Sequence, residues 1–166
     1  MQKADIILAS PRSKQLSPTA LLYRLVLGNR YVHSMLYIGE GKIIHTTTNR
    51  GVIVAKLPRK IYRKDLYTIL RVKNLDKLSR DRVVEAALAW KAKKLDHAGL
   101  VTNVPARLLG LRKPLIRWEK RRIWCSKLIY KSFLDAGIKL VAQEQTENIT
   151  SEDLRNSPRL VSLNTS

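Results

Sequence analysis

Apolar positions in the first half of the chain follow the pattern of β-strands. Short runs rich in aromatic and β-branched residues are separated by glycine-containing turns, a composition typical of strands. Gly39-Glu40-Gly41 stands between two such runs and predicts the tight turn of a hairpin. We expect strands at Ala4–Ala9, Tyr31–Ile38, Lys42–Thr46, Gly51–Ala55 and Leu66–Val72, with the strand from Gly51 antiparallel to the hairpin.

Helical spacing of apolar residues marks other segments of the chain. We expect one helix from Ser17-Pro18 to Gly28, a long one capped by Ser79 that includes Trp90, and one from Cys125 to Gly137. Thr150-Ser151-Glu152-Asp153 resembles a capping box and predicts a short final helix. Residues 96–122 contain two prolines and two glycines, so we expect that stretch to be irregular.

The length and composition agree with a single ordered α+β domain over residues 1–166. The chain has 166 residues, of which 45% are apolar and 27% charged, with few glycines and prolines. No apolar run reaches the roughly 18 residues that span a bilayer, and the start lacks a secretory signal. A cytoplasmic location is therefore the default expectation, with export independent of a signal left open.

A net charge of +19 indicates an anionic partner. Cell-wall polymers and phospholipid headgroups are anionic, and nucleic acid is an alternative partner. Aromatic residues for stacking on single strands are few near the basic positions. These positions are Lys56, Arg59, Lys60, Arg63 and Lys64, and a second group from Arg112 to Arg122. No cofactor is predicted for the chain, and the oligomeric state is not predicted.

Cys125 is the only cysteine of the chain, which excludes an intrachain disulfide and a zinc site built from cysteines. It stands at the predicted start of a helix, where the positive end of the helix dipole favours a thiolate. A nucleophile fits this position. The alternative interpretation is a small buried apolar residue, which is the commoner role of a lone cysteine.

Two of the three histidines lie on the predicted hairpin. Side-chain alternation places His33 on one strand face with Tyr31, Met35 and Tyr37, and the tight turn returns His45 close to His33. A thiol, an imidazole that takes its proton and a polar group that orients the imidazole make up a cysteine hydrolase site. The alternative is that both histidines have structural roles. A metal site built from the two histidines is disfavoured, because no carboxylate stands between them at ligand spacing.

These segments together resemble a known superfamily. The run from Tyr31 to His45, with a second histidine twelve positions after His33, is similar to the histidine hairpin of circularly permuted NlpC-type, papain-like cysteine hydrolases. Trp124-Cys125-Ser126-Lys127-Leu128 is similar to the Cys-Ser-x-Leu run of the YiiX/YebB-like branch, which is related to lecithin:retinol acyltransferase-like proteins. Asp5-Ile6-Ile7 and the segment from Thr150 to Pro158 extend the resemblance over nearly the whole chain.

The resemblance implies a papain-like permuted NlpC-type fold, in which an antiparallel sheet packs against helices that include the catalytic cysteine helix. It implies Cys125 as the nucleophile, His33 as the general base, His45 as the orienting residue and, as a weaker transfer, Tyr31 as an aid to the oxyanion. Ser34-Met35 and Lys127 depart from the family pattern, which bears on substrate preference.

Two functional hypotheses follow. The first is a thiol hydrolase or acyltransferase that attacks an amide bond of a cell-wall peptide or an ester bond of a lipid. The second is a basic module without catalysis, which binds nucleic acid or another polyanion on the same fold. His97 belongs to no motif, and we expect it to be structural or exposed.

Overall fold

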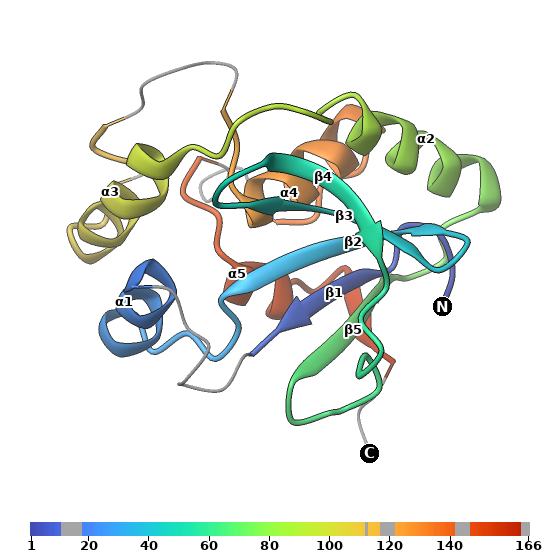
Figure 1. The fold of residues 1–166 in the computed structure, drawn as a ribbon, viewed down its shortest axis with the longest axis horizontal. Helices are drawn as coiled ribbons and strands as arrows, with labels where there is room; N and C mark the ends of the chain where they lie inside the picture. Colours follow the sequence, from blue (N-terminus) through green and yellow to red (C-terminus); the bar gives the residue numbers. More distant parts are fainter. Residues whose placement is uncertain (11–17, 112, 117–121, 142–146, 164–166) are drawn as a thin grey trace.

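The computed structural model describes residues 1–10, 18–111, 113–116, 122–141 and 147–163 (Figure 1). Its centre is an antiparallel sheet of six strands in the order β4-β3-β2-β1-β5-β6. The strands are β1 (Ile6–Ala9), β2 (His33–Gly39), β3 (Lys42–Thr47), β4 (Gly51–Lys56), β5 (Tyr67–Val72) and β6 (Leu160–Ser162). The α+β class and the predicted hairpin are therefore confirmed.

Five helices accompany the sheet in the described part of the chain. They are α1 (Pro18–Val26), α2 (Lys77–Leu88), α3 (His97–Leu108), α4 (Cys125–Asp135) and α5 (Ser151–Arg155). The helix after Pro18, the helix from Cys125 and the capping box at Thr150 and Asp153 are confirmed. Ser17 and most of the predicted basic group after Arg112 lie outside the described residues. No helix among the described ranges is long and apolar enough to cross a membrane.

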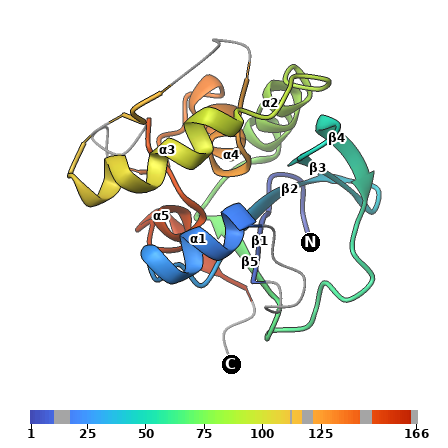
Figure 2. The same cartoon turned by 60° about the vertical axis from the view of Figure 1, so that its left-hand side comes forward.

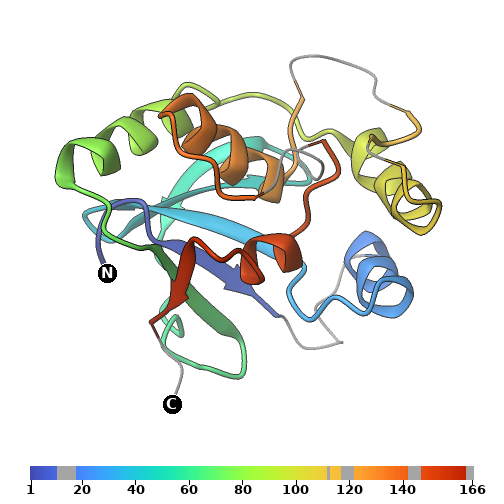
Figure 3. The ribbon, with the colours of Figure 1, turned by 180° about the vertical axis from the view of Figure 1, so that it is seen from behind.

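The two faces of the sheet bury different sets of side chains. On one face, α4 packs against β2 and β3 and also against α2, and Figure 3 shows these helices in front of the sheet. This helix-side core includes Leu8, Leu36, Leu128 and Phe133. The opposite face carries the loop-side core, in which Ile7, Met35, Ile43 and Ile69 pack with Ile61 from the connection between β4 and β5. Alternation along each strand thus sends successive side chains to different cores.

The prediction of an irregular stretch over residues 96–122 is wrong in part, because α3 occupies His97–Leu108. Asp96 caps this helix by accepting a hydrogen bond from the Gly99 amide at 2.9 Å. Gly99 also suits close packing, since a Cβ there would lie 2.5 Å from Asp96 Oδ2 and 3.0 Å from the Trp124 ring. Pro105 lies inside the helix. Gly99, a residue type that usually weakens a helix, is therefore accommodated here by the Asp96 cap and by close packing against Trp124.

Both ends of α2 also differ from the prediction. Helix α2 begins at Lys77 rather than Ser79, because Asp76 is its N-cap and accepts from both the Ser79 amide and the Ser79 hydroxyl. It ends at Leu88, so Trp90 lies beyond it. Strand β6 was not predicted, and with three residues it is too short to give a periodic signal. These differences leave the hairpin and α4 unchanged.

Helices α1 and α3 lie side by side at one end of the molecule, beyond the ends of the strands (Figures 1 and 2). The Tyr23 hydroxyl of α1 donates to the Leu100 carbonyl oxygen of α3 at 2.8 Å, which joins the two helices. His97, the first residue of α3, is exposed, as predicted. This end of the molecule contributes to the cavity described below.

An ion pair with a buried carboxylate joins Asp5, just before β1, to Arg71 of β5. Asp5, of which 1% is exposed, accepts from Arg71 Nε at 2.7 Å and from Arg71 Nη2 at 2.8 Å. The Gln2 amide donates to the same carboxylate at 2.7 Å. A bidentate pair of this kind satisfies both charges, and loss of one partner leaves the other charge uncompensated.

Replacing Asp5 with Ala is therefore expected to lower the free energy of unfolding by about 3 kcal/mol, measured by urea denaturation. Asp81→Ala is the control, because Asp81 forms an ion pair with Lys3 at 2.7 Å in which both side chains are exposed. A much smaller change is expected for the control. Equal losses in the two variants would contradict the role assigned to the buried pair.

Candidate functional site

A cavity of about 450 Å³ is lined by every residue that was predicted for catalysis. These residues are Cys125, His33, His45 and Tyr31. Its walls come from β2, β3, the first turn of α4, the start of α5, and helices α1 and α3. His33 is the first residue of β2 and Cys125 the first residue of α4. The cavity therefore lies where the end of the hairpin meets the beginning of the cysteine helix.

The two hairpin histidines are hydrogen-bonded to each other. The distance between His33 Nε2 and His45 Nδ1 is 3.0 Å, and the rings meet edge to face with their centroids 5.2 Å apart. The cross-strand pairs Leu36–Ile44 and Tyr37–Ile43 set a register in which odd-numbered residues of both strands share a face. The predicted proximity of His33 and His45 is confirmed.

Partial burial favours the neutral form of both imidazoles. It lowers the pKa of His33 from 6.5 to about 4, because the charged ring would lose its hydration. The pKa of His45 is also lowered to about 4, by burial first and then by repulsion from His33. A neutral ring can accept a proton, and the bond to His45 determines which nitrogen of His33 carries its own proton.

The structure corrects the expected state of the thiol. Cys125 is 8% exposed, and this burial raises the pKa of the thiol above its ordinary value. Hydrogen bonds from the Ser34 backbone, the Ser126 hydroxyl and the Cys125 and Ser126 backbone oppose the shift without reversing it. The helix start was predicted to favour the thiolate. Desolvation outweighs that effect, so the thiol is protonated at neutral pH.

No hydrogen bond joins Cys125 Sγ to a ring nitrogen of His33 in the described part of the chain. The thiol lies 3.9 Å from Ser126 Oγ instead. The hairpin histidines share a sheet face with the loop-side core, whereas α4 packs on the opposite face. The two groups therefore belong to opposite faces of the sheet, and both border the same cavity. Catalytic hydrogen bonds often form only when substrate is bound.

Three buried serines form a hydrogen-bonded cluster beside Cys125. Ser34 Oγ lies 2.8 Å from Ser151 Oγ and 3.3 Å from Ser126 Oγ, and Ser126 and Ser151 lie 3.2 Å apart. They come from β2, α4 and α5, so their mutual hydrogen bonds tie three elements together beside Cys125. Ser34 was regarded only as a departure from a family pattern, and Ser151 only as part of a capping box. Neither had a sequence signal for this role.

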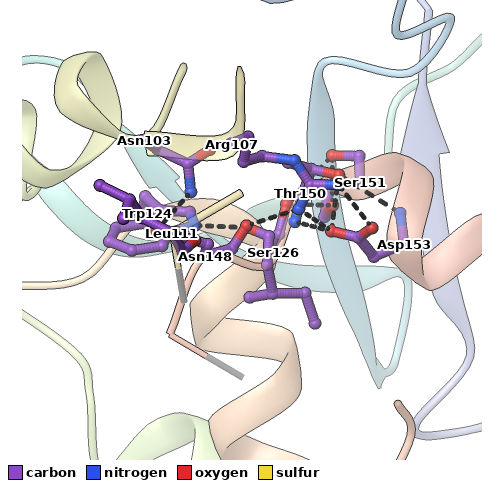
Figure 4. Close-up of polar contacts among 11 residues, drawn as sticks. Asn103, Arg107, Leu111, Trp124, Ser126, Asn148, Thr150, Ser151 and Asp153 are labelled. Carbon is purple, nitrogen blue, oxygen red and sulfur yellow. Dashed lines mark hydrogen bonds and ion pairs between the residues drawn. The ribbon is translucent and has the colours of Figure 1, made fainter. Parts of the chain in front are cut away.

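A polar network fixes the wall of the cavity between α3, α4 and α5 (Figure 4). Arg107 donates to both oxygens of Asp153 at 2.8 and 3.0 Å and to the Asn148 carbonyl at 2.9 Å. Asp153 in turn accepts from the Thr150 amide at 2.7 Å. The Trp124 indole donates to the Ile149 carbonyl at 2.9 Å. This network holds residues 148–151 against the start of α4, where Ser151 reaches the other serines.

Tyr31 borders the cavity but does not share a core with the residues predicted to lie beside it. Strand β2 begins at His33, so alternation does not extend back to Tyr31. The ring packs in the helix-side core, whereas Met35 lies in the loop-side core with Tyr37 against it. Its hydroxyl lies 2.6 Å from Thr68 Oγ1. A hydroxyl with this partner is held in place rather than turned freely toward a substrate.

Among the described residues that line the cavity, none is an aspartate, glutamate, lysine or arginine. Apolar and aromatic side chains form most of the wall, among them Tyr23, Leu95, Leu100, Trp124 and Ile149. Lys127 points elsewhere, because it pairs with Glu147 at 2.6 Å and lies over the Trp124 ring. The described basic residues therefore lie outside the cavity lining.

Comparison with known proteins places the fold. No family model matches the chain, and no curated protein matches it. The crystal structure of the metalloprotein yiiX from Escherichia coli O157:H7 is similar, with a TM-score of 0.66 and 17% sequence identity. The match covers 99% of this chain and 97% of that chain. At this identity the similarity establishes the fold alone, and the chain has a YiiX-like α+β fold.

The lowered histidine pKa values predict how stability depends on pH. Between pH 6.5 and 4 the unfolded chain binds protons that the buried rings do not, so the free energy of unfolding falls as the pH falls through this window. We expect this fall, measured by urea denaturation, to be shallower in a His33→Gln, His45→Gln variant. Parallel curves for the two proteins would contradict the burial of neutral imidazoles.

Proposed function

We propose that this chain is a thiol hydrolase or acyltransferase of the permuted NlpC-type, papain-like kind, acting on an amide or ester bond through Cys125, His33 and His45. The observation that carries the proposal is the 3.0 Å bond between His33 Nε2 and His45 Nδ1 at a cavity that Cys125 also borders. When His33 donates this bond from Nε2, its Nδ1 is left as the basic nitrogen.

The proposed reaction starts from a neutral pair rather than a thiolate and an imidazolium. The raised pKa of Cys125 and the lowered pKa of His33 both favour the neutral forms. His33 takes the thiol proton as Sγ attacks the carbonyl carbon, so general-base catalysis and bond formation proceed together. A change in the Cys125 rotamer, or the arrival of substrate, brings the thiol from Ser126 toward the ring.

The start of α4 can stabilise the negative charge that develops on the substrate's carbonyl oxygen. The first amides of a helix have no partner within the helix, and the amide of Cys125 is one of them. Protonated His33 then gives its proton to the leaving amine or alcohol, which leaves an acyl group on Cys125. Water releases the acyl group in hydrolysis, and a second alcohol or amine releases it in acyl transfer.

The cavity favours an uncharged acyl group. A charged cell-wall peptide would leave its carboxylates against the apolar wall formed by residues such as Leu100 and Ile149, at a desolvation cost of several kcal/mol. An aliphatic or aromatic acyl group gains from burial in the same place. We therefore propose that the acyl side of the scissile bond is apolar and that any anionic part of the substrate stays outside.

A metal-dependent reaction has less support in this chain, although the similar structure is described as a metalloprotein. The described residues contain no group of three or more histidine, cysteine, aspartate or glutamate side chains placed to hold a metal ion. The bond between His33 and His45 also occupies one nitrogen of each ring. The described residues do not fit a metal centre, and no step is assigned to one.

Polyanion binding without catalysis is the second candidate function. The exposed basic residues Lys56, Arg59, Lys60 and Lys64 on and after β4 favour it, and such binding weakens steeply as salt increases. Retention of that binding in a Cys125→Ala, His33→Ala variant distinguishes the second role from the first.

Substitution of the three site residues is expected to have graded effects on the hydrolysis of p-nitrophenyl esters. Cys125→Ala removes the nucleophile and abolishes activity, and His33→Gln lowers kcat/KM by about 10²–10⁴-fold. His45→Gln leaves the base in place but loosens it, so a smaller loss is expected. His97→Gln, at the exposed start of α3, is the control. Full activity of Cys125→Ala would refute the proposal.

The apolar cavity predicts a preference for longer acyl groups. We expect kcat/KM for p-nitrophenyl esters to rise about two- to fourfold for each added CH₂ until the cavity is full, since each buried CH₂ contributes about 0.8 kcal/mol. Esters whose acyl group ends in a carboxylate serve as the comparison, and they should be poorer substrates than neutral esters of equal length. Equal rates across the series would contradict the assignment of the cavity to the acyl group.

A further inference from the structure

Exposed apolar side chains are concentrated on α1, α3 and the segment that follows α3. Among the described residues, nine of the thirteen large exposed apolar side chains belong to these segments. Leu25, Leu108 and Leu109 are 74%, 63% and 68% exposed, which is unusual for leucine. We define the α1–α3 patch as Leu21, Leu25, Val26, Leu108, Leu109 and Leu111.

The segments that carry the patch lie together in space. Helices α1 and α3 are side by side at the same end of the molecule in every view (Figures 1, 2 and 3). The chain folds back at the end of α3, where the Leu111 amide donates to the Ala106 carbonyl at 2.8 Å. The Asn148 side chain fixes this turn by donating to the Leu111 carbonyl at 2.7 Å. Apolar side chains are therefore held outward on an ordered end of the protein.

The charged residues within the segments that carry the patch are all basic. Residues 18–32 and 97–116 contain no aspartate or glutamate, while Arg24 and Lys113 are exposed within them. Arg30, just after α1, is exposed as well. The surrounding chain has a net charge of +19. These segments combine leucine and valine with arginine and lysine and contain no acidic residue. Segments that bind the surface of anionic bilayers have this composition.

We propose that the protein docks on anionic phospholipid bilayers through the α1–α3 patch, with the leucines entering the headgroup region and the basic residues contacting phosphates. Aliphatic side chains neither stack on bases nor contact phosphates, so a nucleic-acid partner would not explain why the patch is apolar. A second copy of the chain would bring two strongly positive surfaces together. A bilayer satisfies both the apolar and the basic residues.

Docking at this end places the bilayer beside the wall of the cavity. Ala20 and Tyr23 of α1 and Leu100 of α3 line the cavity from the inner sides of the same helices that carry the patch. A lipid acyl group leaving the bilayer would therefore be close to the helices that line the cavity around Cys125. The docking surface itself does not depend on the proposed chemistry, because it rests on exposure and charge alone.

The test is co-sedimentation of the full chain with vesicles of phosphatidylcholine, alone or mixed with phosphatidylglycerol. We expect binding to the anionic vesicles and a partition coefficient at least about tenfold lower for Leu108→Ser, Leu109→Ser, since each leucine loses its burial. Arg24→Gln and Lys113→Gln are each expected to lower it about fivefold. Leu78→Ser is the matched control, because Leu78 is 61% exposed on α2, outside the patch.

Three results would overturn the proposal. They are unchanged binding of the Leu108→Ser, Leu109→Ser variant, equal binding to neutral and anionic vesicles, and a wild-type dimer that this variant dissociates in sedimentation equilibrium. Circular dichroism of the variants shows whether they remain folded. Cys125→Ser should bind vesicles like the wild type. A protein that binds vesicles but hydrolyses no ester would refute the proposed function and leave the docking surface standing.

Discussion

The packing of α4 against the hairpin is the constraint on which the site depends. Leu128 and Phe133 are fully buried against the sheet, and this fixes the direction of the helix and the place where it begins. The hydrogen bonds among Ser34, Ser126 and Ser151 then hold that first turn against β2 and α5. The backbone at Cys125 is therefore held near β2, which begins at His33. Core packing thus sets the position of the reactive groups.

The same burial determines the electrostatics of the site. The described residues of the cavity lining include no charged side chain, so they offer little stabilisation to a thiolate or an imidazolium, and neutral forms of both groups are favoured. The described basic residues lie outside this lining, where solvent reaches them. Under the proposed function, the exterior attracts an anionic surface and the cavity accepts an apolar group.

Much of this arrangement could be predicted from local sequence signals. The Gly39–Gly41 turn and the β-branched runs beside it identified the hairpin, and alternation then placed His33 and His45 on one face. Tyr31 was misplaced because alternation holds only within a strand, and β2 starts two residues later. Helix α3 was missed because Pro105 and Gly99 usually end helices, whereas here Asp96 and Trp124 accommodate Gly99.

The remaining features depend on contacts between distant segments. The serine cluster joins residues of three elements, and the raised pKa of the Cys125 thiol reflects how deeply α4 packs. Neither leaves a periodic or compositional trace in the chain.

The most direct measurement of the central claim is mass spectrometry of the protein quenched during turnover of a p-nitrophenyl ester. The account predicts one acyl group on the tryptic peptide Ile123–Lys127, attached to Cys125. Turnover without such an adduct, or an adduct elsewhere, would contradict it.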